Sequence, residues 1–199
     1  MKNSNRIFVF LFAITSMVSC SFINQSNYSK LDDEFTGRKT FTVTQYVNSA
    51  EKNFDIGSVK IIFQRIQIEN NENLIAYFVI NRYSSSFDLE NKAFLKANGQ
   101  KYELFIDKRN TDYKTSTSTS SSNSTTTDST SVNTINTTET STRNWSEEKF
   151  SIPLNKDIAK SLIEGNDVFF RFYFGPRVAT YKLSESQISN LKKMFEDKL

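Results

Sequence analysis

Histidine is absent from this sequence of 199 residues, and cysteine occurs once, as Cys20. The first absence removes the most common general base near neutral pH and the most common ligand of transition metals. The second excludes an internal disulfide and a cysteine-rich metal site. Ser–His–Asp and Cys–His catalytic groups both need histidine, so neither can form from these residues. We therefore expect no bound metal and no cofactor.

Glycine is also scarce: the five glycines are not clustered, so no glycine-rich loop of the phosphate-binding kind is present. The G-x-S-x-G motif of serine hydrolases is absent too. Of the 25 basic residues, two lie in the first 19 positions, which leaves 23 basic and 22 acidic residues in the rest of the chain. This near balance does not favour nucleic acid as a partner.

Acidic side chains are plentiful, so a pair of carboxylates for sugar hydrolysis stays open as an alternative. The candidates are Asp88, Glu90, Glu147 and Glu148, whose spacing is not diagnostic of a catalytic pair. Solvated strand ends are the favoured interpretation of these four residues. We therefore name no catalytic residue and expect that the protein is not an enzyme.

The first 19 residues have the pattern of a secretory signal. Lys2 and Arg6 precede an apolar stretch of 12 residues that runs from Ile7 to Val18. A helix of 12 residues is about 18 Å long, whereas the hydrocarbon core of a bilayer is about 30 Å thick. We expect this segment to direct export rather than to span a membrane.

The signal segment ends at Met17-Val18-Ser19-Cys20. These four residues resemble the lipobox of bacterial lipoproteins, although Met17 stands where that family usually has leucine. The resemblance implies cleavage before Cys20, thioether lipidation of Cys20, and acylation of the new amino terminus, with palmitate as a typical chain. Serine rather than aspartate at position 21 favours the outer membrane over the inner membrane. Ordinary signal cleavage, for instance after Ser21, is the alternative and would release a soluble protein.

Eight segments are rich in β-branched and aromatic residues and are predicted to be strands. In chain order they are 39–47, 58–68, 74–80, 94–97, 100–106, 145–154, 167–174 and 177–183. Asn98-Gly99 and Gly175-Pro176 predict the turns of two hairpins. Near Ile61-Ile62 the alternation changes phase, which predicts a bulge. The segment 74–80 is apolar throughout, which predicts a central strand covered on both faces.

Two helices are also predicted. Asn155 can cap a short crossover helix over 156–164, and Ser184 with Gln187 predicts a capping box at the start of a C-terminal helix. Together the elements predict a mainly β fold, an antiparallel β-sandwich of about eight strands. Through Phe87-Asp88-Leu89 and 97–102, the stretch 41–104 also resembles immunoglobulin-like domains of bacterial lipoproteins. That resemblance implies a fold and no activity.

Two segments are expected to lie outside the ordered fold. Residues 20–38 are polar and without a period, and we expect them to form the lipidated N-terminus and a tether. Residues 111–142 are nearly all serine, threonine and asparagine, with almost no apolar side chains to offset the entropy cost of ordering. We expect a disordered loop there, which interrupts a single β-rich domain over 39–199 and joins strands 100–106 and 145–154, a potential hairpin.

Arg171 lies in a strongly aromatic segment, 168–174. Alternation would turn three phenylalanines inward and leave Arg171 and Tyr173 on the wetter face. An ordinary half-buried strand is the favoured interpretation. The alternative is a surface for a glycan or peptide formed by Arg171 and Tyr173, which Arg177 could join after the Gly-Pro turn.

From these features we expect a lipid-anchored protein of the cell envelope that acts as a non-catalytic binding or structural module. Its partners would be the membrane, through the lipid on Cys20, and another envelope protein or a glycan. A surface glycan hydrolase that uses paired carboxylates is one alternative. A secreted soluble binding protein without lipid is the other.

Overall fold

The computed structural model describes residues 26–51, 55–69, 71–83, 87–128 and 131–197. The signal segment 1–19 and Cys20 lie outside these residues. Within them, ten strands form two antiparallel sheets, one of six strands and one of four. The mainly β, sandwich-like architecture is therefore confirmed. Two of the ten strands were not predicted.

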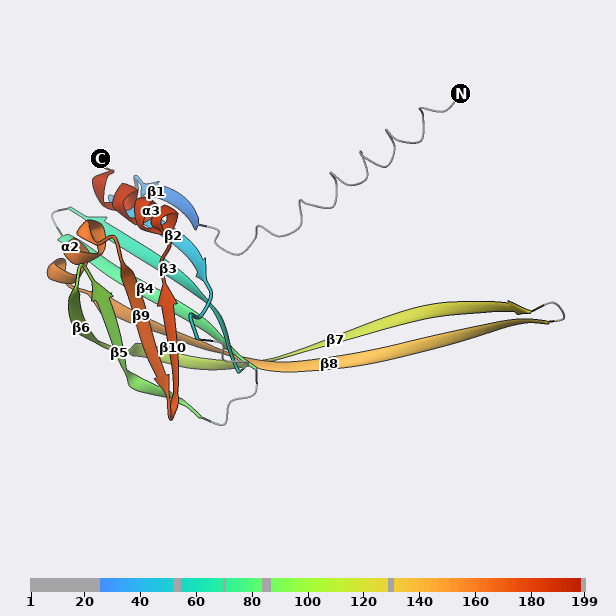
Figure 1. Cartoon of the computed structure of the whole chain (residues 1–199). Helices are drawn as coiled ribbons and strands as arrows, with labels where there is room; N and C mark the ends of the chain where they lie inside the picture. The colour runs from blue at the N-terminus through green and yellow to red at the C-terminus, as the bar shows by residue number, and fades with distance from the viewer. Residues whose placement is uncertain (1–25, 52–54, 70, 84–86, 129–130, 198–199) are drawn as a thin grey trace, which may run out of the picture.

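The larger sheet has the strand order β1-β2-β3-β4-β8-β7, and the smaller sheet has the order β10-β9-β5-β6. The strands of the larger sheet are β1 (Ser26–Asp33), β2 (Arg38–Val47), β3 (Ile56–Ile68), β4 (Asn71–Arg82), β7 (Asp107–Asp128) and β8 (Ser131–Leu154). Those of the smaller sheet are β5 (Leu89–Ala97), β6 (Gln100–Phe105), β9 (Val168–Phe174) and β10 (Arg177–Lys182). Figure 1 shows the two layers and the helices α2 (Lys156–Glu164) and α3 (Glu185–Glu196).

Aromatic rings fill the space between the two sheets. Phe78 on β4 lies 5.1 Å between ring centroids from Phe150 on β8 and 5.1 Å from Phe172 on β9. Phe170 on β9 contacts the same ring edge-on at 5.2 Å. Burial of a phenylalanine contributes about 1.5–3 kcal/mol, so this cluster supplies much of the free energy that holds the sheets together.

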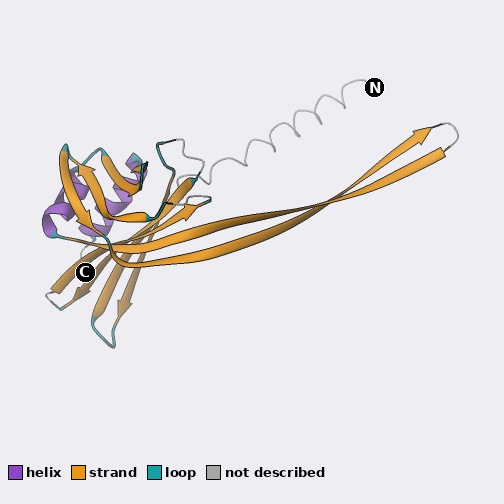
Figure 2. Cartoon of the chain, turned by 90° about the horizontal axis from the view of Figure 1, so that it is seen from below, coloured by secondary structure: helices purple, strands orange, loops and turns teal. Residues whose placement is uncertain are grey.

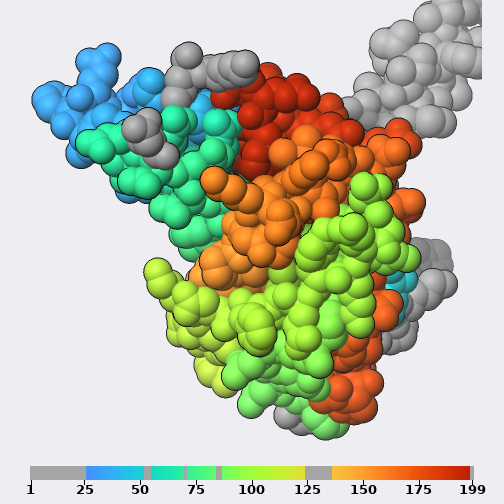
Figure 3. Space-filling view, turned by 90° about the vertical axis from the view of Figure 1, so that its left-hand side faces the viewer, coloured from blue at the N-terminus to red at the C-terminus, as the bar shows by residue number. Residues whose placement is uncertain are grey.

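Helix α3 covers part of the larger sheet that the smaller sheet leaves open. It packs on β1, β2 and β3 and contacts α2. Gln45 on β2 donates to the Gln187 carbonyl at 2.7 Å, and the Gln187 amide donates to the Tyr46 carbonyl at 2.9 Å. On the face shown in Figure 3, α3 (red), α2 (orange) and the β5–β6 region (green) lie side by side.

The predicted caps and turns are confirmed. Asn155 caps α2, and Ser184 with Gln187 forms the capping box of α3. Asn98 and Gly99, which join β5 to β6, have φ angles of 49° and 74°. Those positive angles suit a two-residue turn of the type that asparagine and glycine favour.

Two details of the strands differ from the prediction. The irregularity in β3 lies between Ile56 and Val59, earlier than Ile61-Ile62. Ile62 is an apolar residue on the outer face, next to the inward-facing Ile61. Two adjacent isoleucines therefore look like a change of phase in the sequence, although the strand is regular there. In β4 the core-facing side chains are buried and the alternate ones are half-buried, so this strand is covered fully on one face only.

Residues 26–38 are not a tether. Ser26–Asp33 forms β1, which pairs along its whole length with β2. Three of its eight side chains are half-buried and the rest are exposed, so no hydrophobic alternation marks the strand in the sequence. The backbone ladder to β2 and polar contacts with α3 order it instead, among them the hydrogen bond from the Asn190 amide to the Ser26 hydroxyl at 2.8 Å.

The expected disordered loop over 111–142 is replaced by a two-stranded ribbon formed by β7 and β8. Figure 2 shows it projecting far from the body. From Thr115 to the end of β7 it extends about 45 Å at about 3.3 Å per residue. Apolar burial does not order these residues; a continuous backbone ladder and many β-branched threonines support extended structure here. Cross-strand side-chain bonds such as Thr115 Oγ1 to Asn144 Oδ1, at 2.9 Å, add to the ladder.

The expected hairpin between 100–106 and 145–154 does not form. The first segment is β6 in the smaller sheet, whereas the second belongs to β8 in the larger sheet. Instead, β8 lies between β4 and β7, and β7 begins at Asp107, directly after β6. The chain therefore changes sheets within two residues.

Shortening the ribbon should leave the body intact. If an Asn-Gly turn replaces residues 115–144, it joins Lys114 to Trp145, which are already cross-strand partners. All side chains at 115–123 and 136–144 are exposed, so their removal takes nothing from the core. We expect the urea midpoint of the shortened protein to equal or slightly exceed that of the full chain. A clear loss of stability would mean that the ribbon packs on the body.

Candidate functional site

A groove of about 440 Å³ lies on the outer face of the smaller sheet. Its position follows from the alternation of β9, whose phenylalanines at 170, 172 and 174 are buried and whose intervening residues face outward. The lining includes three aromatic and three cationic side chains, namely Phe94, Phe169, Tyr173, Lys96, Lys101 and Arg171. These residues come from β5, β6 and β9.

Strand register brings the lining together. On β5, Phe94 lies opposite Arg171 of β9, and Lys96 lies opposite Phe169. Lys101 on β6 lies opposite Lys96 from the other side. Between β5 and β9 each cation therefore faces a ring, whereas between β5 and β6 the two lysines face each other. Side chains of opposed residues lie about 5 Å apart at Cβ, which is close enough for one ligand to touch several of them.

The rings and cations of the groove contact one another. Phe94 and Tyr173 meet edge to face, with 5.9 Å between ring centroids. The Lys101 ammonium lies 3.9 Å from the centroid of Phe94. Such a contact holds a lysine over a ring and leaves its other hydrogen-bond donors free for a ligand.

Arg171 is exposed and oriented by one neighbour. Its Nε donates to the Thr180 hydroxyl at 3.0 Å. In the described part of the chain, no other hydrogen bond of its guanidinium is present. The two terminal nitrogens therefore form a free edge, which is the geometry that a carboxylate binds with two parallel hydrogen bonds.

Glu51 is the single acid in the lining of this groove. Its Oε2 accepts from the Thr180 backbone N–H at 2.6 Å and from the Ser49 hydroxyl at 3.0 Å. Partial burial works to raise the pKa of Glu51, but the hydrogen bonds from Thr180 and Ser49 outweigh it and place the pKa below its usual value. At neutral pH the groove thus holds three cations against one carboxylate.

Of the three residues predicted from the sequence to form a ligand surface, the structure brings two together. The groove contains Arg171 and Tyr173, but Arg177 does not line it. Arg177 lies opposite the inward-facing Phe174 and forms an ion pair with Asp55. Sequence reasoning missed Phe94, Lys96, Lys101 and Glu51, because they lie on other segments and only strand pairing brings them to β9. The alternation of Phe94 and Lys96 within β5 was the one local signal available.

Comparison with known proteins adds nothing to this picture. No family model, curated protein or solved structure matches the chain.

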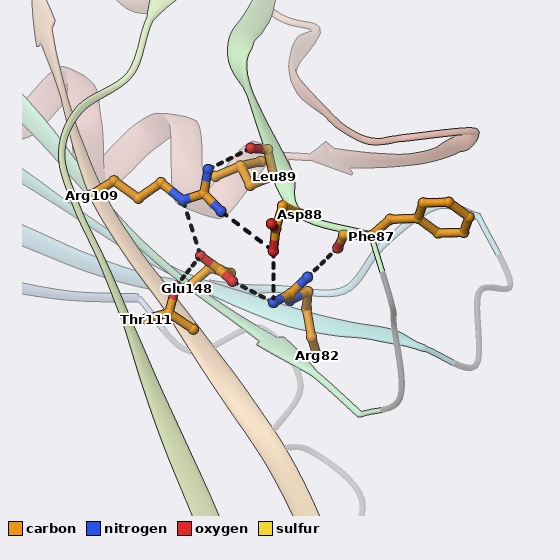
Figure 4. A network of polar contacts seen from close by, with 7 residues as sticks. All are labelled: Arg82, Phe87, Asp88, Leu89, Arg109, Thr111 and Glu148. Carbon is orange, nitrogen blue, oxygen red and sulfur yellow. Dashed lines mark hydrogen bonds and ion pairs between the residues drawn. The ribbon is translucent and has the colours of Figure 1, made fainter.

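A second polar cluster lies inside the fold at the root of the ribbon (Figure 4). Glu148 of β8 has a side chain that is 0% exposed, and its Oε1 lies 2.7 Å from Arg82 Nη2. Its Oε2 accepts from the Thr111 hydroxyl at 2.9 Å and from Arg109 Nε at 3.4 Å. Asp88, 85% exposed, lies within 4 Å of both guanidinium groups, at 3.8 Å and 3.9 Å.

This cluster joins the two sheets. Arg82 donates to the Phe87 carbonyl, and Arg109 donates to the Leu89 carbonyl at 2.6 Å, where the chain enters β5. The two guanidinium groups balance the two carboxylates. Because Glu148 is fully enclosed and paired, it is poorly placed to meet a substrate, and the geometry indicates a structural role.

The four candidate carboxylates occupy different environments in the structure. Glu148 is not a solvated strand end, because it occupies an inward position in the alternation of β8. Asp88 is exposed, as expected, and joins the same cluster. Glu147 pairs with Lys149 at 3.4 Å on the opposite face of β8, and Glu90 is exposed on β5.

The described ranges contain neither a metal-binding cluster nor a membrane-spanning helix. There, no group of three or more histidine, cysteine, aspartate or glutamate residues is placed to hold a metal ion. No helix in the same ranges is long and apolar enough to cross a membrane.

Proposed function

We propose that this protein is an exported, lipid-anchored cell-envelope protein that binds an acidic glycan in the groove on its smaller sheet, without catalysis. The observation that carries the proposal is the lining of that groove, where three aromatic rings and three cations surround a single carboxylate. The signal segment and Cys20 are the basis for the envelope location. Ser21 supports the outer membrane as the site of anchoring.

The groove combines the two features that an acidic sugar needs. Aromatic rings offer apolar surface to the face of a sugar ring, and cations bind its carboxylate. The free edge of Arg171 suits a planar carboxylate, because guanidinium presents two parallel donors. Lys96 and Lys101 lie on the same face and add charge attraction to a polyanionic chain.

A glycan hydrolase is the weaker reading of the same groove. Hydrolysis of a glycosidic bond typically uses two carboxyl groups about 5–9.5 Å apart. Glu51 is the single acid among the residues that line the groove. A hydrolytic activity that one Asp→Asn or Glu→Gln change abolishes, in a variant that still folds, would restore this reading.

The groove predicts that Arg171→Ala weakens binding to a uronic-acid polymer such as polygalacturonate. A hydrogen-bonded charge is worth about 1.5–3 kcal/mol, so we expect Kd to rise about tenfold or more. The melting temperature should change little, since Arg171 is exposed. Calorimetric titration of the mature protein measures the affinity, and thermal unfolding measures the stability.

Arg177→Ala is the matched control, because it makes the same substitution on the same hairpin. Arg177 lies on β10, just after the turn, and does not line the groove. The substitution should leave the affinity within about twofold of that of the natural protein. Neutral dextran should bind far more weakly than polygalacturonate. Equal binding of both polymers, or equal effects of the two arginine variants, would contradict the proposal.

A further inference from the structure

The ribbon has an open edge along the whole of β7. In the larger sheet β7 is the terminal strand, so among the described strands β8 is its sole partner. Each alternate residue on this edge presents an unpaired backbone N–H and C=O. Such an edge is a template for pairing with another strand unless charge, proline or a bulge blocks it.

Nothing in the outer part of β7 blocks pairing. The 13 residues from Thr115 to Thr127 include no charged residue and no proline. The bulge of β7 lies at its root, between Asp107 and Asn110, well before this run. The outer part of β8 differs, because Glu139 and Arg143 interrupt it. The uncharged edge of β7 is therefore the one suited to accept a strand.

The outer ribbon has only two strands and, among its described side chains, no buried face to stabilise it. A two-stranded hairpin is at best marginally stable in water, and three or more strands with a buried face are usually required. In the outer ribbon every described side chain is exposed, so no face is buried. An added strand would supply a second ladder of backbone hydrogen bonds to β7.

We propose that two copies of the protein pair through the outer edges of their β7 strands, antiparallel and about a two-fold axis at Ser121. In this register each residue faces the one equally far on the other side of Ser121, so Thr115 faces Thr127. The run is bounded in the sequence by Lys114 and Asp128, which carry opposite charges. The same register places Lys114 of one copy opposite Asp128 of the other.

The charged ends select this register. A shift by two residues would move Lys114 and Asp128 out of alignment and leave uncharged positions opposite them. Lys114 also lies 4.0 Å from Asp112 in its own strand, which does not prevent a second ion pair. A two-fold contact of this kind closes on itself and yields a dimer, not a fibre.

The register places the two bodies at opposite ends of the paired segment. The two copies of Lys114 lie 14 residues apart along the paired strands, a separation of about 45 Å. The far end of each ribbon comes level with the root of the other. Exposed aromatic residues lie at that root, including Tyr113 and Tyr83, and they offer apolar contact there.

Cysteine cross-linking in intact envelopes tests the pairing. Ser121 faces itself across the axis at about 4.5–5.5 Å between Cα atoms, which is within the range of a disulfide. We expect Ser121→Cys to give mainly covalent dimer after mild copper-catalysed oxidation and non-reducing electrophoresis. The unchanged chain, which retains Cys20, shows the background.

Two further variants test the register. Thr119 faces Asn123 across the axis, whereas each lies about 13 Å from its own copy, beyond the reach of a disulfide. Thr119→Cys and Asn123→Cys should therefore cross-link when two differently tagged chains are coexpressed, and at least tenfold less when either is expressed alone. Cross-linking of all variants to equal extents would indicate random collision and overturn the proposal. No dimer with Ser121→Cys would overturn it too.

Discussion

Replacing Glu148 by glutamine should lower the free energy of unfolding by about 3 kcal/mol, the largest stability effect that we expect from a single polar substitution here. The side chain is fully enclosed and lies against Arg82, whose side chain is 6% exposed. Glutamine keeps the shape of Glu148 but removes its charge. Two guanidinium groups would then share Asp88, which is mostly in solvent. Urea denaturation measures the change.

Glu147→Gln is the matched control, since it makes the same chemical change one residue away. Glu147 forms a partly exposed pair with Lys149, and such pairs are worth about 0–1 kcal/mol. A double variant, Arg82→Met with Glu148→Leu, should recover most of the loss, because well-packed apolar groups can replace a buried ion pair. If Glu148→Gln and Glu147→Gln had equal effects, Glu148 would not be the centre of the cluster.

The second large effect concerns location. Cys20→Ala should move the protein from the membrane fraction to a soluble or unprocessed form, and metabolic labelling with palmitate should disappear. Each buried acyl CH₂ contributes about 0.8 kcal/mol, so two or three chains hold a protein essentially permanently, and their loss leaves no comparable attachment. Fractionation followed by immunoblotting measures the shift.

Ser21→Ala is a suitable control for that experiment, because it alters the neighbouring position and keeps the cysteine. It should retain both the label and the membrane association. A natural chain that takes up no label and is found in the medium would contradict the lipid anchor and favour the secreted alternative. The proposal that the groove binds a glycan would be unaffected by that result, because it is tested separately through Arg171.

Strands that bury a face were predictable from the sequence, and strands that bury none were not. The alternation of Phe41 and Val43 in β2, and the aromatic alternation in β9, mark a face that meets the core. The eight predicted strands are of this kind. By contrast, β1 and the outer part of β7 are held by backbone ladders and polar contacts, which leave no hydrophobic period in the sequence.

The candidate site was predictable only where it lies on one strand. Arg171 and Tyr173 were placed together because they are two residues apart on β9. Phe94 reaches the same groove because β5 pairs with β9 far along the sequence, and Lys101 follows because β6 pairs with β5, which periodicity does not reveal. For Glu148 a local signal existed. It alternates with Phe150 and Ile152, which are buried, so an acid at an inward position indicated a buried ion pair.

The continuity of β8 has a mechanical consequence. This strand runs from the far end of the ribbon into the larger sheet, where it lies between β7 and β4, so a pull on the ribbon becomes tension along the strand axis. The ladder between β8 and β4, from Arg82–Ser146 to Leu74–Leu154, would bear that tension in shear, and its hydrogen bonds would have to rupture together. The ion pair of Arg82 and Glu148 reinforces the ladder where the tension enters. A partner that applies force to the ribbon would therefore displace the whole body before the β4–β8 ladder ruptured.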